Sequence, residues 1–148
     1  MRKRLAPTLI VAVLLAGCSI PRWPVDGVVT SPYGLRMRGW SPDIHEGVDV
    51  AASSGTPVRA MKSGHVEHAG AWGGYGLSVL LTHGSNVRTL YAHLSRIDVR
   101  EGESVSGQQV IGAVGQTGNA TGPHLHFEVW RWERAEDPVP LLGSRPSR

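Results

Sequence analysis

The chain has 148 residues, of which 41% are hydrophobic and 18% are charged, with 19 Gly and 10 Pro. This composition is that of one ordinary folded domain, and it excludes a disordered chain, a membrane-embedded chain and a second domain of any size. The formal net charge is +3 at pH 7, but three of the basic residues stand together at positions 2–4.

The N-terminal segment has the pattern of a targeting signal. Its three basic residues precede an apolar run from Leu5 to Ala16, which ends in Leu15-Ala16-Gly17-Cys18. This order predicts a cleaved secretory signal peptide over residues 1–17, and the run is shorter than the ~20 apolar residues of a spanning helix. The four final residues resemble a bacterial lipobox, which implies a lipid on Cys18. The alternative is a plain signal that ends in an unpaired cysteine.

Cleavage before Cys18 would change both the charge and the location of the protein. It would leave twelve basic residues, equal to the twelve acidic ones. No Lys/Arg block would remain to follow a phosphate backbone, so we expect no nucleic-acid partner. We expect an exported, membrane-anchored lipoprotein of the cell envelope, and Ser19 indicates the outer membrane, facing the periplasm, in a Gram-negative host. Residues 18–24 would then be the lipidated Cys18 and a short linker.

Residues 25–142 are expected to form the folded domain, followed by a tail at 143–148. Short β-branched or apolar runs alternate there with Gly and Pro, and none has the length or period of a helix. Many short strands between Gly-containing turns predict an all-β, antiparallel sandwich or barrel-like fold. The expected strands are Val28–Thr30, Val48–Val50, Pro57–Arg59, His65–Glu67, Leu77–Thr82, Val87–Tyr91, Val110–Ile111 and Leu125–Trp130.

Two histidine-containing segments have the alternation of a strand with one polar face. If residues 45–49 form a strand, His45 and Asp49 share a face, and Gly47 between them leaves room for a metal ion. In residues 124–129, His124 and His126 share a face opposite three apolar side chains. Either pair alone is weak evidence for a metal site, because a lone histidine on a strand is more often solvated or hydrogen-bonded than bound to a metal. Together the two faces would supply the nitrogen and oxygen ligands that Zn²⁺ prefers.

Two further segments are expected to shape a groove beside these histidines. Residues 36–44, with Trp40, form a loop before the first histidine. Residues 71–76 combine flexible glycines with Trp72 and Tyr75, which could hold an extended peptide. For the second segment, a Gly-rich hairpin turn with two half-buried rings is equally possible.

Five segments in this order closely resemble the LytM-type (M23) zinc endopeptidases of peptidoglycan. The resemblance spans roughly residues 30–141 and implies an antiparallel all-β domain with a duplicated hybrid motif. The segments are Thr30–Arg36, His45–Asp49, Gly55–Val58, Tyr91–Leu94 and Thr117–Glu128.

The resemblance implies a role for each matching residue. His45, Asp49 and His126 match the ligands of one Zn²⁺ per domain, and His93 and His124 match two uncoordinated catalytic histidines. The implied reaction is hydrolysis of cross-links or stem peptides of the cell wall by zinc-activated water. Which of the two histidines acts first as general base stays open, as do the bond that is cleaved and the oligomeric state. For His83 we expect a structural hydrogen bond.

Other functions are compatible with the same fold. Some LytM-like envelope domains have lost zinc and activate an amidase instead, so the fold alone does not establish an enzyme. Because those domains lack the ligands and this chain keeps them, the sequence favours the hydrolase. A hydrolase of this size could serve bacterial remodelling or phage lysis.

Overall fold

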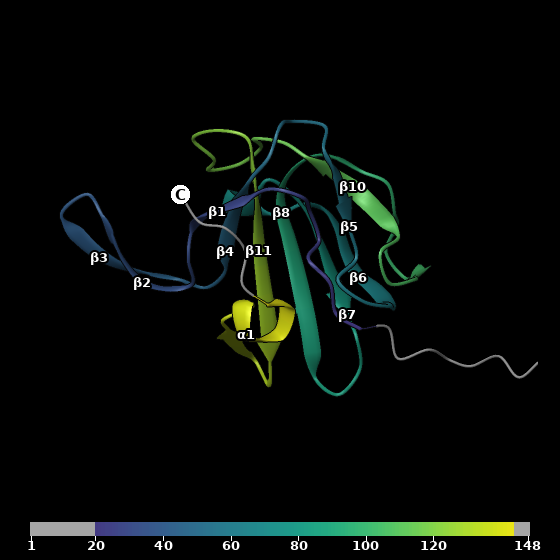
Figure 1. The fold of residues 1–148 in the computed structure, drawn as a ribbon. Coiled ribbons are helices and arrows are strands. Elements are labelled where there is room, and N and C mark those ends of the chain that lie inside the picture. The colour runs from purple at the N-terminus through teal and green to yellow at the C-terminus, as the bar shows by residue number, and fades with distance from the viewer. Residues whose placement is uncertain (1–19, 144–148) are drawn as a thin grey trace, which may run out of the picture.

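The computed structural model describes residues 20–143, which form short strands and two short helical turns (Figure 1). No helix within this range is long and apolar enough to cross a membrane. The predicted signal peptide, Cys18 and the tail after residue 143 lie outside the described residues. The elements are β1 (Val28–Ser31), β2 (Gly34–Arg38), β3 (Ser41–His45), β4 (Val48–Ala51), β5 (Pro57–Arg59), β6 (Gly64–Ala71), η1 (Gly73–Tyr75), β7 (Leu77–Thr82), β8 (Val87–Ile97), β9 (Ser104–Val105), β10 (Val110–Val114), β11 (His124–Arg131), β12 (Arg134–Glu136) and α1 (Val139–Leu142).

Every pairing between the described strands is antiparallel, which confirms the expected all-β fold. The main path runs β1-β4-β11-β8-β7-β6-β9, with β12 added to β11 and with β10 paired to both β5 and β8. The long strand β8 pairs with β11 through residue 92 and with β10 from residue 94 onward. It therefore joins two parts of the sheet, and Figure 1 shows β5 and β10 beside it.

The core collects the inward-facing residues of these strands. On β11 the alternation is as predicted, because Leu125, Phe127 and Val129 are at most 1% exposed and His124 lies opposite them. Tyr91 and Phe127 pack with their ring centroids 5.2 Å apart. The other buried members of this cluster are Val25, Val29, Val48, Val50, Val58, Ala60, Met61, Val66, Val79, Leu81, Leu94, Val99, Val105, Ile111 and Val114.

The segment expected as a loop at residues 36–44 belongs to a β-hairpin. Strands β2 and β3 pair only with each other among the described residues, and the hairpin projects from the body in Figure 1. Leu35, Met37 and Ile44 are each more than 60% exposed. The sequence pattern did not reveal these strands because their apolar residues do not face the core.

The expected continuous strand from His45 to Asp49 is interrupted. Strand β3 ends at His45, and β4 begins at Val48. A Cβ atom on Gly47 would lie 2.4 Å from the Phe127 carbonyl oxygen. The absence of a side chain at this position therefore allows β11 to approach closely, a role of Gly47 that differs from the expected one of leaving room for a metal ion.

Residues expected in the linker lie against the domain. The Arg22 amide donates to the Met61 carbonyl at 3.0 Å, and the Pro24 carbonyl accepts from the Arg59 amide at 2.7 Å. Val25 is only 3% exposed. The segment before β1 is thus part of the packed domain from residue 22 onward.

Candidate metal centre

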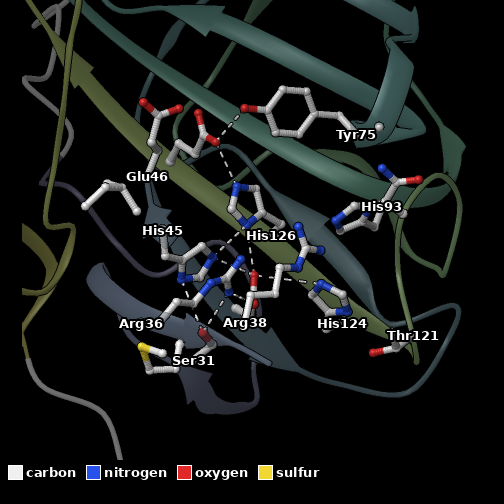
Figure 2. Close-up of a pocket in the computed structure, with 16 residues that line it drawn as sticks. Ser31, Arg36, Arg38, His45, Glu46, Tyr75, His93, Thr121, His124 and His126 are labelled. Carbon is white, nitrogen blue, oxygen red and sulfur yellow. Dashed lines mark hydrogen bonds and ion pairs between the residues drawn. The ribbon is translucent and has the colours of Figure 1, made fainter. Parts of the chain in front are cut away.

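Three potential metal ligands from three strands meet on the face of the sheet opposite the core. His45 ends β3, Asp49 lies on β4 and His126 lies on β11, where it pairs directly with Asp49. His45 Nε2 is 3.1 Å from both Asp49 Oδ1 and His126 Nδ1, and the last two atoms are 2.8 Å apart. The structure thus brings together the three residues predicted as ligands (Figure 2).

The second ring nitrogen of each ligand histidine is occupied by an acceptor. His45 Nδ1 lies 2.7 Å from the Pro32 carbonyl oxygen, and His126 Nε2 lies 2.8 Å from Glu128 Oε1. A carbonyl or carboxylate oxygen can only accept, so each of these nitrogens carries a hydrogen. On binding a cation, His45 Nε2 and His126 Nδ1, the two atoms that face Asp49, would present the lone pairs of neutral imidazoles.

This donor set fits a zinc ion. Ligand atoms at 2.0–2.1 Å from a tetrahedral Zn²⁺ lie about 3.3 Å from one another. The three atoms here are separated by 2.8–3.1 Å, so small side-chain shifts would suffice. Two imidazoles and one carboxylate would also leave the fourth position of a tetrahedral ion free.

Asp49 is held from both of its oxygens. Oδ1 faces the two histidines, while Oδ2 lies 3.5 Å from a guanidinium nitrogen of Arg36 on β2. Arg36 also donates to Asp43 at 3.2 Å and to Ser31 at 3.1 Å. Burial alone would raise the pKa of Asp49, but its hydrogen bonds with His126 and His45 hold that pKa well below the usual range. The carboxylate is therefore ionised and ready to bind a cation.

His126 lies between two carboxylates in the absence of a metal. Its side chain is 10% exposed, and burial disfavours its charged form. The hydrogen bonds to Asp49 and Glu128 outweigh burial and raise the pKa of His126 to about 9. This polar surrounding suits a cation at the centre of the three ligand atoms.

The two histidines predicted as catalytic lie beside the ligand atoms, and each donates through Nδ1 to a backbone carbonyl, as His45 does. His93 Nδ1 donates to the Thr117 carbonyl and His124 Nδ1 to the Gly122 carbonyl, both at 2.8 Å. Their Nε2 atoms therefore carry the lone pairs, and His124 Nε2 lies 3.7 Å from Asp49 Oδ1. The ring centroids of His93 and His124 are 4.8 Å apart. Figure 2 shows both rings on the side of His126 away from His45.

A bulge in β8 directs His93 to this face. The register of β8 shifts near residue 93 against both β7 and β10, and His93 has a left-handed φ of 60°. Tyr91 and Leu94 are both core residues, although strict alternation would put residues three apart on opposite faces. The extra residue of the bulge restores the core face after His93.

The environment of His93 favours its neutral form. Burial lowers the pKa of His93, and the hydrogen bond to the Thr117 carbonyl offsets only part of this effect. The nearby His124 and His126 lower the pKa of His93 further. A neutral imidazole with an open Nε2 can accept a proton from a group placed between it and the ligand atoms.

A cavity of about 570 Å³ is lined by the three ligand residues and by the two histidines beside them. Arg38 and Met37 of the hairpin line one side, and Tyr75 of η1 lines another. Trp40 at the hairpin tip is 99% exposed and does not line the cavity, whereas Tyr75 donates to Glu128 Oε1 at 2.9 Å. Of the aromatic residues expected to shape the groove, Tyr75 is therefore the one that the structure places at the ligand atoms.

His83 makes the structural hydrogen bonds that were expected of it. Its Nδ1 donates to the Ser63 carbonyl at 2.8 Å, and its Nε2 lies 2.7 Å from the Thr89 hydroxyl. The Thr89 hydroxyl lies 2.9 Å from the hydroxyl of Tyr91, which accepts from the Met61 amide at 2.9 Å.

Sequence reasoning missed Arg36 and Glu128 as parts of the site. The alternation that singled out His124 and His126 places Glu128 on the same face, so a signal for it was present. Arg36 stood in a segment that carried the family resemblance, but its contact with Asp49 depends on the hairpin, which the sequence pattern did not reveal.

Comparisons with known proteins agree with this geometry. Residues 43–138 match the model of Peptidase family M23. The DD-carboxypeptidase/endopeptidase Mpg of Neisseria meningitidis is 49% identical over 105 residues, and the match covers 68% of this chain and 24% of that protein. The murein hydrolase activator EnvC of Escherichia coli is 36% identical over 134 residues, and the match covers 86% of this chain and 31% of that protein.

A solved structure shows the same similarity. The crystal structure of a zinc containing peptidase from Vibrio cholerae superimposes with a TM-score of 0.76 at 32% identity, covering 86% of this chain and 40% of that one. The chain spans about a quarter to a third of the length of the two curated relatives. Because the family match, the fold and the residues at this site agree, the chain belongs to peptidase family M23.

Proposed function

We propose that the chain is a zinc-dependent endopeptidase that hydrolyses peptide cross-links or stem peptides of bacterial peptidoglycan. One observation carries this proposal: the lone-pair atoms of His45, Asp49 and His126 converge, and two further imidazoles stand beside them. Zinc bound there would polarise a peptide carbonyl and lower the pKa of a water molecule.

The protein's own residues supply positioning and proton transfer. A peptide in the cavity would lie against His93 and His124, whose Nε2 atoms are open. One ring can take a proton from the attacking water, and a protonated ring can return it to the leaving amine. A ring that carries a proton can also donate to the oxygen on which negative charge develops. Arg36 would keep the Asp49 carboxylate in place during these steps.

The names of the two relatives support the substrate class. Mpg is named for DD-carboxypeptidase and endopeptidase activity, and EnvC for activating a murein hydrolase. Each matches this chain over only part of its own length, so the substrate is inferred from the shared domain together with the site.

The test is digestion of cross-linked peptidoglycan by the full chain, purified in mild detergent, with the products identified by mass spectrometry. We expect loss of cross-linked or stem peptides, prevented by a zinc chelator and absent in His126→Ala. The matched control is His65→Ala, which removes an exposed histidine of β6 and should retain activity. Cleavage by His126→Ala at the wild-type rate would refute the proposal.

A second candidate is a catalytically silent module that activates an amidase. The 36% identity to EnvC is the observation that favours it. If zinc binds and no peptide bond is cleaved, this function replaces the first, and added amidase should then release stem peptides faster in the presence of the protein.

The sequence of the N-terminal segment motivates one proposal about location. We infer that the protein is held at a membrane of the cell envelope by a lipid on Cys18. Cys18→Ala should move the protein from the membrane fraction to the soluble fraction. Unchanged fractionation of this variant would count against the anchor.

A further inference from the structure

Glu128 is a buried carboxylate that contacts the ligand residue His126. It is 1% exposed, although it lies on the face of β11 opposite the core. Oε1 accepts from His126 Nε2 at 2.8 Å and from the Tyr75 hydroxyl at 2.9 Å, and Oε2 accepts from Trp130 Nε1 at 2.5 Å. A buried charge is retained at low cost only when such partners surround it.

The position of Glu128 excludes direct action on a metal or a substrate. It contacts His126 through Nε2, whereas the other ligand atoms lie at Nδ1, across the ring. The imidazole therefore separates the Glu128 carboxylate from a metal at the three ligand atoms. Both carboxylate oxygens are already engaged by protein donors, so Glu128 is poorly placed to serve as a general base.

The contact matters when a metal binds His126. Asp49 Oδ1 lies 2.8 Å from Nδ1, and Glu128 Oε1 lies 2.8 Å from Nε2. A metal that binds Nδ1 and Asp49 replaces the first contact, and Glu128 is then the acceptor that keeps the hydrogen of the neutral imidazole on Nε2. With the hydrogen on Nε2, the lone pair of Nδ1 points at Asp49 and His45. With the hydrogen on Nδ1, an N–H group would face the other ligands and His126 could not bind.

We propose that Glu128 is a positioning residue, which holds His126 with its hydrogen on Nε2 and thereby sets the affinity of the site for zinc. The inference rests on the proposed function in that the group His45, Asp49 and His126 is taken as the zinc site. Tyr75 and Trp130 fix the carboxylate from two sides. Because Tyr75 belongs to η1, the wall of the cavity is connected to a metal ligand through Glu128.

Zinc affinity tests this proposal independently of catalysis. The full chain in detergent is stripped of metal and titrated with zinc in competition with a chromophoric chelator. Glu128→Gln keeps the side-chain volume but removes the charge and one acceptor, so we expect zinc affinity to fall by about 10- to 100-fold. Glu67→Gln is the control, since it makes the same change at an exposed carboxylate that pairs with Arg88 and does not contact the ligand residues; its affinity should stay near that of the wild type.

The state of the His126 ring gives a second readout that a purely structural role would not affect. Two-bond ¹H–¹⁵N spectra of the zinc-loaded proteins, assigned with His126→Ala, should show the Nε2 hydrogen shifted downfield by the carboxylate in the wild type and less so in Glu128→Gln. An Nε2 hydrogen with the same shift in both proteins would overturn the proposal, and so would an unchanged zinc affinity in folded Glu128→Gln. Zinc-loaded wild type that cleaves no peptide would instead overturn the proposed enzyme and leave the role of Glu128 intact.

Discussion

Replacing His93 with glycine should give a more stable protein than replacing it with alanine, which reverses the usual order in a strand. His93 has a φ of 60° at the bulge of β8. A residue with a Cβ atom is destabilised by about 1–2 kcal/mol in this left-handed region, whereas glycine is not. Both variants lose the imidazole and its hydrogen bond to Thr117, so that loss cancels in the comparison.

The expected difference follows from two opposing effects. Glycine regains the strain of about 1–2 kcal/mol, but its greater freedom in the unfolded chain costs about 0.5–1 kcal/mol relative to alanine. His93→Gly should therefore unfold with a free energy on the order of 0.5–1 kcal/mol higher than that of His93→Ala. Ala92→Gly is the control, because Ala92 is fully buried and its φ is not left-handed. It should lose about 1–2 kcal/mol, from the same entropy and a lost methyl group.

Urea unfolding of the metal-free proteins, followed by circular dichroism, measures these differences. A chelator in every sample removes any contribution of bound zinc to stability. His93→Ala that is as stable as His93→Gly, or more stable, would refute the reasoning from the backbone of β8.

Three further predictions concern the core and the metal site. Tyr91→Phe leaves the buried amide of Met61 without its acceptor, so the free energy of unfolding should fall by about 1–3 kcal/mol; a neutral effect in urea would contradict this. Burial lowers the pKa of His83, so its stabilising contribution is present above about pH 6.5 and is lost as the pH falls. The loss of stability in His83→Asn should thus be smaller at pH 5.5 than at pH 7.5. In the exposed control His65→Asn, the change in stability should be the same at both pH values. Zinc at 100 times its Kd should raise the free energy of unfolding by about 2.7 kcal/mol; an unchanged Tm would refute the site.

The sequence was most informative where an element has one face in the core. Leu77–Thr82 was predicted with the bounds that β7 has in the structure. The alternation in β11 identified the residues that face the core and the two histidines opposite them. Local patterns sufficed in these strands because burial of alternate residues determines both the element and its orientation.

The parts that local patterns did not predict depend on contacts between distant segments. The hairpin lacks a core face, and the bulge at His93 interrupts the alternation of β8. The ring orientations of His45 and His93 depend on the carbonyls of Pro32 and Thr117, which lie 13 and 24 residues away in the sequence. The close approach that requires Gly47 likewise comes from β11, so only the assembled sheet explains it.

Strands β2 and β3 pair with each other in a sheet of their own. The hairpin that lines the cavity could therefore change in length, and with it the peptides that fit the cavity, without a change in the rest of the fold. The five cross-strand pairs from Gly34↔His45 to Arg38↔Ser41 form their own ladder, so adding or removing a pair near Gly39 leaves the register of the ten-stranded sheet untouched. The reach of the hairpin over the cavity can therefore vary among descendants of this sequence while the ligand geometry is inherited. In protein engineering, the tip at Gly39 and Trp40 is accordingly the place to graft new substrate recognition.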